Sequence, residues 1–213
     1  MHRKNLKYCW AIVLAGLLIC GARVDASEID FEVGLSDTEV PVLTMIRPSE
    51  VDEPYVLARI ASGEFEGHYM NIEPGWDGLA VDRPNSNVNA LGDMAEVALE
   101  RISFDAAFTL YDIDGNEILM SDGDTRVFVG DPETEEFVWH EHLLFGVDPG
   151  SDPSQTYSAT FRFVDSNGVY GASEDFTLVF QPLEPQSCGG GGCGAIGMTG
   201  LIMSLVGLTR FRR

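Results

Sequence analysis

The chain has 213 residues, which leaves room for one domain of ordinary size between two unusual ends. Residues 27–187 contain six arginines, no lysine and 33 of the 34 Asp and Glu residues, so six positive against 33 negative charges give this stretch a formal charge of −27. Such a surface repels nucleic acid and anionic lipid, because binding either depends on Lys and Arg side chains that neutralise phosphates. The composition therefore excludes nucleic-acid binding, and it indicates adaptation to saline surroundings, where salt screens the self-repulsion.

The first 26 residues have the three parts of a secretory signal peptide. A basic start is followed by an apolar run over residues 10–20 and by small residues at Val24 and Ala26. We expect signal peptidase to cleave after Ala26. The alternative is an uncleaved anchor, but the apolar run is shorter than the ~20 residues that span a bilayer.

The four cysteines all lie near the two ends, at Cys9, Cys20, Cys188 and Cys193. Residues 27–185, which we take as the folded domain, contain none. The domain cannot rely on disulfide bonds even though the leader sends it to an oxidising compartment. Its stability must come from its hydrophobic core or from bound ions.

Between the ends the apolar residues recur with a period of two, which predicts β-strands. The clearest cases are residues 29–35, 157–163 and 176–180. Further strands are expected at residues 40–46, 55–61, 65–72, 97–102, 107–112, 125–129 and 137–147. Only residues 91–101 also have a pattern that fits a helix.

Turn signals separate these strands. Asp114-Gly115 and Asn167-Gly168 each lie between apolar runs and predict hairpins. Residues 73–93 are rich in polar and turn-forming residues and predict a long loop, which is either functional or a surface insertion without a role.

Eight to ten short strands without intervening helices favour an all-β fold, an antiparallel β-sandwich. The strand, turn and strand over residues 157–180 resemble the last hairpin of immunoglobulin-like and cadherin-like bacterial domains. The resemblance implies an immunoglobulin-like sandwich, and the number and spacing of the strands also fit a jelly roll.

Three histidines lie beyond the leader: His68, His140 and His142. In His140-Glu141-His142 the two imidazoles lie on one face of a strand, ~7 Å apart along it, and can reach one metal ion. His68, with Glu66 on the same face, is the candidate for a third ligand of a zinc site. The alternative is that all three histidines are ordinary surface residues.

Calcium is the second candidate ion. Asp112, Asp114 and Asn116 begin like an EF-hand loop, but no Glu follows at the twelfth position. Calcium between loops would also be favoured by the negative charge of the domain. The alternative is that Asp114-Gly115-Asn116 is simply a hairpin turn.

Enzymatic activity has little support. The chain contains no Gly-x-Ser-x-Gly motif, the domain has no cysteine, and no phosphate-binding loop is present. We assign no catalytic residue. A metal-dependent hydrolase centred on His68, His140 and His142 is the alternative to a protein without catalytic activity.

Residues 186–213 form a distinct tail. Cys188 and Cys193 flank four glycines, an apolar run covers residues 195–209, and the chain ends on Arg210, Arg212 and Arg213. The arginines would hold this end in the cytoplasm, so the domain would face outward. A plain C-terminal membrane anchor is the alternative to a processed signal.

The glycine and cysteine stretch, the apolar helix and the terminal arginines resemble the PEP-CTERM, GlyGly-CTERM and MYXO-CTERM sorting tails of Gram-negative bacteria. The resemblance implies a sorting protease that cleaves near the cysteines and transfers the protein to the envelope or surface. We therefore expect an exported, envelope-attached β-sandwich with a structural or binding role, with metal binding as the alternative.

Overall fold

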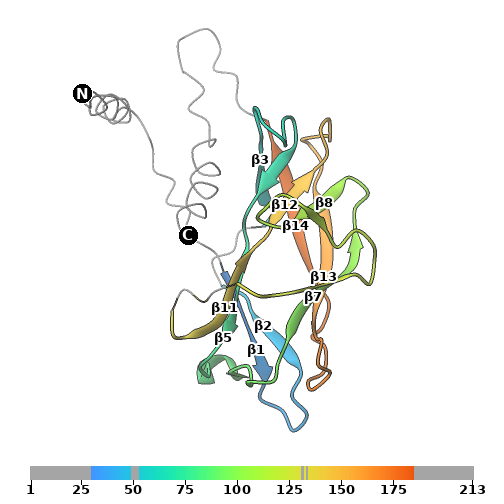
Figure 1. Ribbon diagram of the computed structural model, residues 1–213. Helices are drawn as coiled ribbons and strands as arrows, with labels where there is room; N and C mark the ends of the chain where they lie inside the picture. The colour runs from blue at the N-terminus through green and yellow to red at the C-terminus, as the bar shows by residue number, and fades with distance from the viewer. Residues whose placement is uncertain (1–29, 49–52, 131, 133, 185–213) are drawn as a thin grey trace, which may run out of the picture.

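The computed structural model describes residues 30–48, 53–130, 132 and 134–184, and the described part is built from strands (Figure 1). The first seven are β1 (Asp30–Ser36), β2 (Leu43–Ile46), β3 (Tyr55–Arg59), β4 (Tyr69–Asn71), β5 (Gly75–Leu79), β6 (Val88–Asn89) and β7 (Val97–Phe104). The others are β8 (Phe108–Tyr111), β9 (Glu117–Ile118), β10 (Thr125–Val127), β11 (Phe137–His142), β12 (Leu144–Val147), β13 (Tyr157–Asp165) and β14 (Phe176–Leu183). One short 3₁₀ helix, η1 (Pro84–Ser86), is the only helical turn among the described residues. The expectation of an all-β fold is confirmed.

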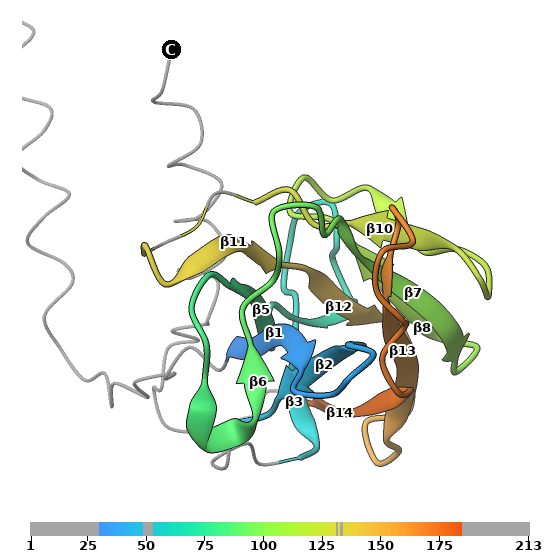
Figure 2. The ribbon, with the colours of Figure 1, turned by 90° about the horizontal axis from the view of Figure 1, so that it is seen from below.

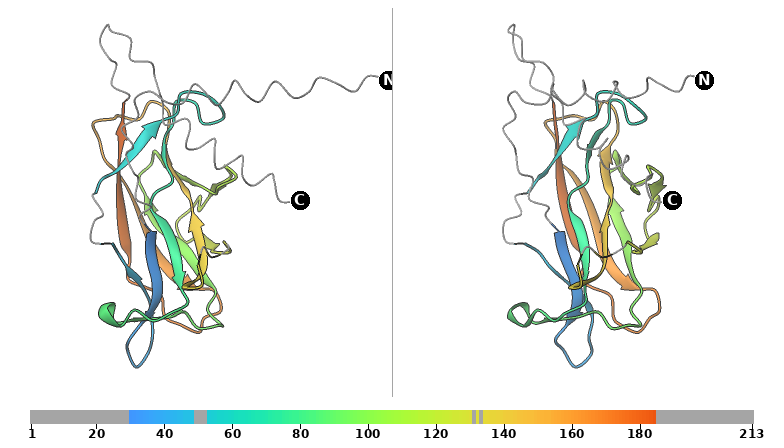
Figure 3. Two further views of the ribbon diagram at one scale, coloured as in Figure 1. Left: turned by 90° about the vertical axis from the view of Figure 1, so that its left-hand side faces the viewer. Right: turned by 60° about the vertical axis from the view of Figure 1, so that its left-hand side comes forward.

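Two sheets form the domain. The first sheet has the strand order β11-β5-β1-β2, with β6 beside β1, and the second has the order β10-β7-β13-β14-β3-β4-β12-β8-β9. The strands of both sheets surround a common interior, a sandwich that approaches a barrel (Figures 2 and 3). Most neighbours are antiparallel, but β1 and β5 are parallel, as are β14 and β3. The sheets are therefore mixed rather than purely antiparallel.

The core lies between the sheets and follows the period of two. Alternate residues of β13 are buried, among them Phe161 and Phe163, and Phe31 and Val33 of β1 are fully buried as the sequence predicts. Aromatic rings link the two sheets, since Phe128 packs against Trp76 and Trp139 of the first sheet and against Phe163 of β13. A core of this size provides the stability that disulfide bonds do not.

The expected strand at residues 137–147 is in fact two strands. β11 pairs with β5 in the first sheet, whereas β12 pairs with β4 and β8 in the second. Leu143, fully buried, separates them. The chain passes from one sheet to the other at this residue, and β11 runs on into β12 in Figure 1.

The expected long loop at residues 73–93 contains the central strand of the first sheet, and the prediction was wrong there. Gly75–Leu79 forms β5, every residue of which is buried between β1 and β11. The other reading of residues 91–101, a helix, is also wrong, because Val97 begins strand β7.

Of the two expected hairpins, the one at Asp114-Gly115 is confirmed, since β8 and β9 pair across it. At Asn167-Gly168 the chain turns, but β14 begins only at Phe176, so residues 166–175 form a longer loop. The leader and the tail lie outside the described residues, and their roles stay predictions. Within the described residues, no helix has the length and hydropathy that a membrane crossing needs.

Candidate metal site on the first sheet

Three neighbouring strands of the first sheet bring the candidate site together. Asp30 of β1 and His142 of β11 both pair with Gly75 of β5. Two residues further along both strands, Asp77 of β5 pairs with His140 of β11. These two rows lie on the same face of the sheet, because residues two apart on a strand point to the same side.

The other face of the same strands explains why these polar side chains point outward. Phe31, Trp76 and Trp139 alternate with the site residues and are buried in the core. A slip of one residue in register would turn the polar row inward and the aromatic row outward, at a large cost in buried apolar area. The hydrophobic core thus fixes the direction in which His140 and His142 face.

One nitrogen of each histidine and one oxygen of Asp30 lie within 4.8 Å of one another. His142 Nε2 lies 3.8 Å from Asp30 Oδ1, and the two imidazole ring centroids are 4.7 Å apart. Three ligands bound tetrahedrally to zinc at ~2.1 Å would be ~3.4 Å apart. The ligand atoms, which lie within 4.8 Å of one another, must therefore move closer together to hold zinc.

Hydrogen bonds fix the proton positions on both imidazoles. His142 Nδ1 lies 3.1 Å from the carbonyl oxygen of Ile72, which can only accept, so Nδ1 carries the hydrogen. His140 Nδ1 lies 2.9 Å from Oδ1 of Asp77, a buried carboxylate that accepts in the same way. In both neutral rings the lone pair is therefore on Nε2. Metal-binding histidines usually donate the N–H of the ring nitrogen that does not bind the metal to an acceptor of this kind.

Gly75 leaves the space that the ligands occupy. A Cβ atom at this position would lie 2.2 Å from Asp30 Oδ1 and 2.6 Å from His142 Cε1. Any side chain at position 75 would therefore push the Asp30 carboxylate and the His142 ring apart. The missing side chain at the centre of the row is what allows Asp30 and His142 to converge over β5.

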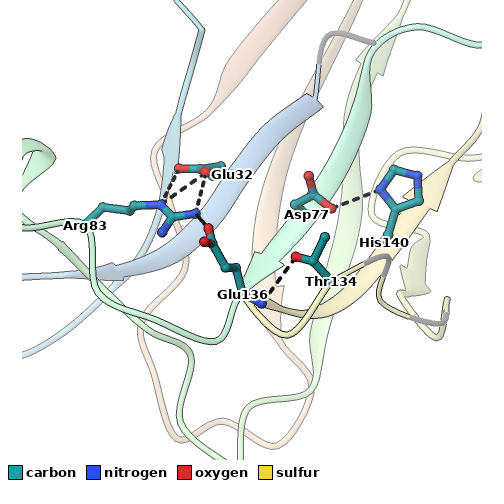
Figure 4. Close-up of polar contacts among 6 residues, drawn as sticks. All are labelled: Glu32, Asp77, Arg83, Thr134, Glu136 and His140. Atoms are coloured by element: carbon teal, nitrogen blue, oxygen red, sulfur yellow. Dashed lines mark hydrogen bonds and ion pairs between the residues drawn. The ribbon is translucent and has the colours of Figure 1, made fainter.

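A separate ionic cluster lies beside the site on the same face (Figure 4). Arg83 donates to both carboxylate oxygens of Glu32, at 2.9 to 3.2 Å, and to Glu136 at 2.9 Å. The hydrogen bonds that Arg83 donates to Glu32 raise the pKa of Arg83 above its ordinary value. Glu32 is the residue of β1 that pairs with Asp77, yet its carboxylate is held by the arginine.

The donor set indicates the class of metal. Two imidazole nitrogens and one carboxylate oxygen suit zinc and other divalent first-row metals. Calcium takes six to eight oxygen ligands and is a poor match for this site.

Of the three histidines in the predicted zinc site, the structure brings together two. His140 and His142 share a face of β11 as expected, but His68 precedes β4, with its ring edge-on to Phe65 and its Nδ1 3.3 Å from the Phe65 carbonyl. His68 is not in the ligand group of the described residues, and Asp30 takes the third place. The side chain of Glu66 is likewise outside that group.

The predicted calcium residues hold a turn. Oδ1 of Asp112 accepts hydrogen bonds from the backbone N–H groups of Asp114 and Asn116, at 3.0 and 2.9 Å, and from the Asn116 amide. Burial raises the pKa of Asp112, but these hydrogen bonds outweigh it, so the pKa lies below its ordinary value. This is the arrangement of an Asx turn. Calcium at this hairpin stays a prediction.

Sequence reasoning did not find Asp30, Asp77 or Gly75. Asp30 is one of 34 acidic residues, and no local pattern separates it from the others. The remaining predicted site residues, Ala26 and the cysteines and arginines of the tail, lie outside the described residues.

Comparison with known proteins gives no relative from which a role could be transferred. No protein-family model, no curated protein and no solved structure matches this chain.

Proposed function

We propose that this chain is an exported, envelope-attached β-sandwich domain that binds one divalent transition metal, zinc first, through Asp30, His140 and His142. The observation that carries the proposal is the pairing of both Nδ1 atoms with acceptors, together with the 4.8 Å within which one nitrogen of each histidine and one oxygen of Asp30 lie of one another. Surface histidines without a ligand have no need of this arrangement.

The metal would have a structural role in a domain that lacks disulfide bonds. Asp30 lies at the start of β1 and His142 at the end of β11, with β5 between them. A shared ion would therefore tie three strands of the first sheet together. Zinc at 100 times its dissociation constant would add about 2.7 kcal/mol to the free energy of unfolding.

The experiment is a measurement of zinc content on residues 27–185, which contain no cysteine. Protein refolded with zinc and then dialysed should hold one zinc per chain by elemental mass spectrometry. The double variant His140→Ala/His142→Ala should hold almost none, and its thermal midpoint should no longer respond to zinc. Binding should weaken in acid, because protons compete with the metal for the imidazole nitrogens.

His68→Ala is the matched control, since it removes a histidine outside the ligand group. It should keep the zinc content and the zinc-dependent midpoint of the parent protein. Retention of a full zinc equivalent by the double variant would rule out the assigned ligands.

The exported and envelope-attached part of the proposal depends on the two ends of the chain. A leader cleaved after Ala26 and a tail that resembles bacterial sorting signals support it. The immunoglobulin-like or jelly-roll type of sandwich belongs to the same proposal, since displayed domains commonly use it.

Intact-mass analysis of the surface form tests the processing. We expect a mature protein that begins at Ser27 and ends near Cys188 or Cys193, without the terminal arginines. A surface form that still carries Arg213 would leave only the plain membrane anchor.

A further inference from the structure

The candidate ligands approach the metal position from the sheet side. Asp30 and His142 stand on either side of Gly75, and His140 stands one row further along the same face. The floor beneath the metal position is the backbone of a glycine. The three donors therefore stand over β5, on the face of the first sheet opposite to the buried Phe31, Trp76 and Trp139.

The neighbouring side-chain and backbone oxygen atoms are already engaged in other hydrogen bonds. Oδ1 of Asp77 accepts from His140 Nδ1, and the Ile72 carbonyl accepts from His142 Nδ1. Glu32 is held by Arg83 through three contacts. Among the described residues, the ligand group contains only three members of the His, Cys, Asp and Glu types.

The ligand side chains are mostly buried but keep limited contact with solvent. The side chains of His140, Asp30 and His142 are 13%, 16% and 18% exposed. In structural zinc sites four protein ligands close the coordination sphere, whereas three protein ligands leave a position for water.

We propose that the metal held by Asp30, His140 and His142 keeps one coordination position open to solvent, filled by an exchangeable water that a small external donor can replace. This inference rests on the proposed metal binding. The site would then belong to the metal sites with three protein ligands and one water, in which the metal lowers the pKa of the bound water and accepts ligands from outside the chain.

Charge selects the kind of donor that can enter. A divalent ion and the Asp30 carboxylate leave one net positive charge, and the buried Asp77 carboxylate behind His140 offsets it. The domain carries −27 over residues 27–187, which repels polyanions. The open position therefore favours neutral donors and small monoanions over phosphorylated or polyacidic ligands.

Cobalt(II) provides the test, because its visible absorption reports a change of coordination directly. The sample is the full-length chain in detergent with its four cysteines, Cys9, Cys20, Cys188 and Cys193, replaced by serine. One equivalent of cobalt should give d–d bands that the double variant His140→Ala/His142→Ala lacks. Sodium azide should then shift these bands in a saturable titration, while the same ionic strength of sodium perchlorate leaves them unchanged.

The outcomes separate the two proposals. Cobalt bands that depend on the histidines but do not respond to azide would overturn the open position and leave metal binding standing. Absence of histidine-dependent bands would overturn both. A Glu32→Gln variant should respond to azide as the parent does; a response seen in this variant alone would identify Glu32 as a fourth ligand and overturn the inference.

Discussion

Replacing Gly75 with alanine is expected to lower zinc affinity about 100-fold, the upper range for changes that misplace metal ligands. The new methyl group would overlap Asp30 Oδ1 and the His142 ring, so the two ligands must rotate away from each other. The strand itself should persist, because alanine loses less backbone entropy than glycine on folding. Competition titrations with a zinc chelator give the affinity, and thermal melts in EDTA give the stability of the metal-free fold.

Gly146→Ala is the matched control. Gly146 is also a buried strand glycine, but a Cβ atom there would meet its nearest atoms, in Tyr111 and Met70, at 3.4 to 3.7 Å, which is ordinary contact. This variant should bind zinc as the parent does. If Gly75→Ala also kept the parent affinity, the convergence of Asp30 and His142 over β5 would have no part in metal binding.

Replacing Asp165 with alanine is expected to lower the free energy of unfolding of the domain by about 3 to 5 kcal/mol. Hydrogen bonds to a buried carboxylate are charge-assisted, and their loss leaves several backbone N–H groups without an acceptor. Oδ1 of Asp165 accepts from the backbone N–H groups of Glu96 and Asn167, and Oδ2 accepts from those of Val169 and Tyr170. The carboxylate thereby joins the loop at residues 166–175 to the segment that precedes β7. Urea denaturation of the parent and the variant measures the difference.

The effect of Asp165 should depend on pH. Burial raises the pKa of this carboxyl, but the four N–H donors outweigh it and hold the pKa below its ordinary value. Its contribution to stability is therefore complete above the unfolded-state pKa of about 3.9 and is lost as the pH falls toward the lower folded-state pKa. The difference in the free energy of unfolding between the parent and Asp165→Asn, whose side chain cannot ionise, should become smaller below pH 4.

Asp152→Ala is the control for this pair of measurements. Asp152 also accepts hydrogen bonds in a turn, from the N–H and hydroxyl groups of Ser154, but it is exposed. Its removal should change the urea midpoint little. An equally small change in Asp165→Ala would show that water replaces the lost carboxylate without cost.

The sequence predicted the regular strands because their signal is local. In β13 and β14 apolar residues alternate with polar ones, since one face packs on the core and the other meets solvent. β5 carries no such signal. Gly75 and Gly78 occur there because side chains from neighbouring strands fill their space, such as the Trp139 ring that lies against Gly78. A strand whose partners supply its packing looks like a loop in its own sequence.

The same distinction separates the predicted part of the site from the rest. His140 and His142 are two residues apart, and the period of two alone places them on one face. Asp30 joins them only because β5 pairs with β1 on one side and with β11 on the other, which brings together residues that are 142 − 30 = 112 positions apart in the chain. His68 falls on the strand expected at residues 65–72, but the order of strands in a sheet cannot be read from residue types.

The passage of the chain from β11 to β12 has a consequence for cooperativity. The two strands belong to different sheets, yet only Leu143 separates them. If β11 left the first sheet, it would therefore displace β12 from the second sheet, and the reverse also holds. Opening of the first sheet at His142 would pull on the pairing of Leu144 with Tyr111 in the second. Free energy from an ion bound at Asp30, His140 and His142 would therefore be shared by both sheets, and the domain would unfold as one unit rather than as two separable layers.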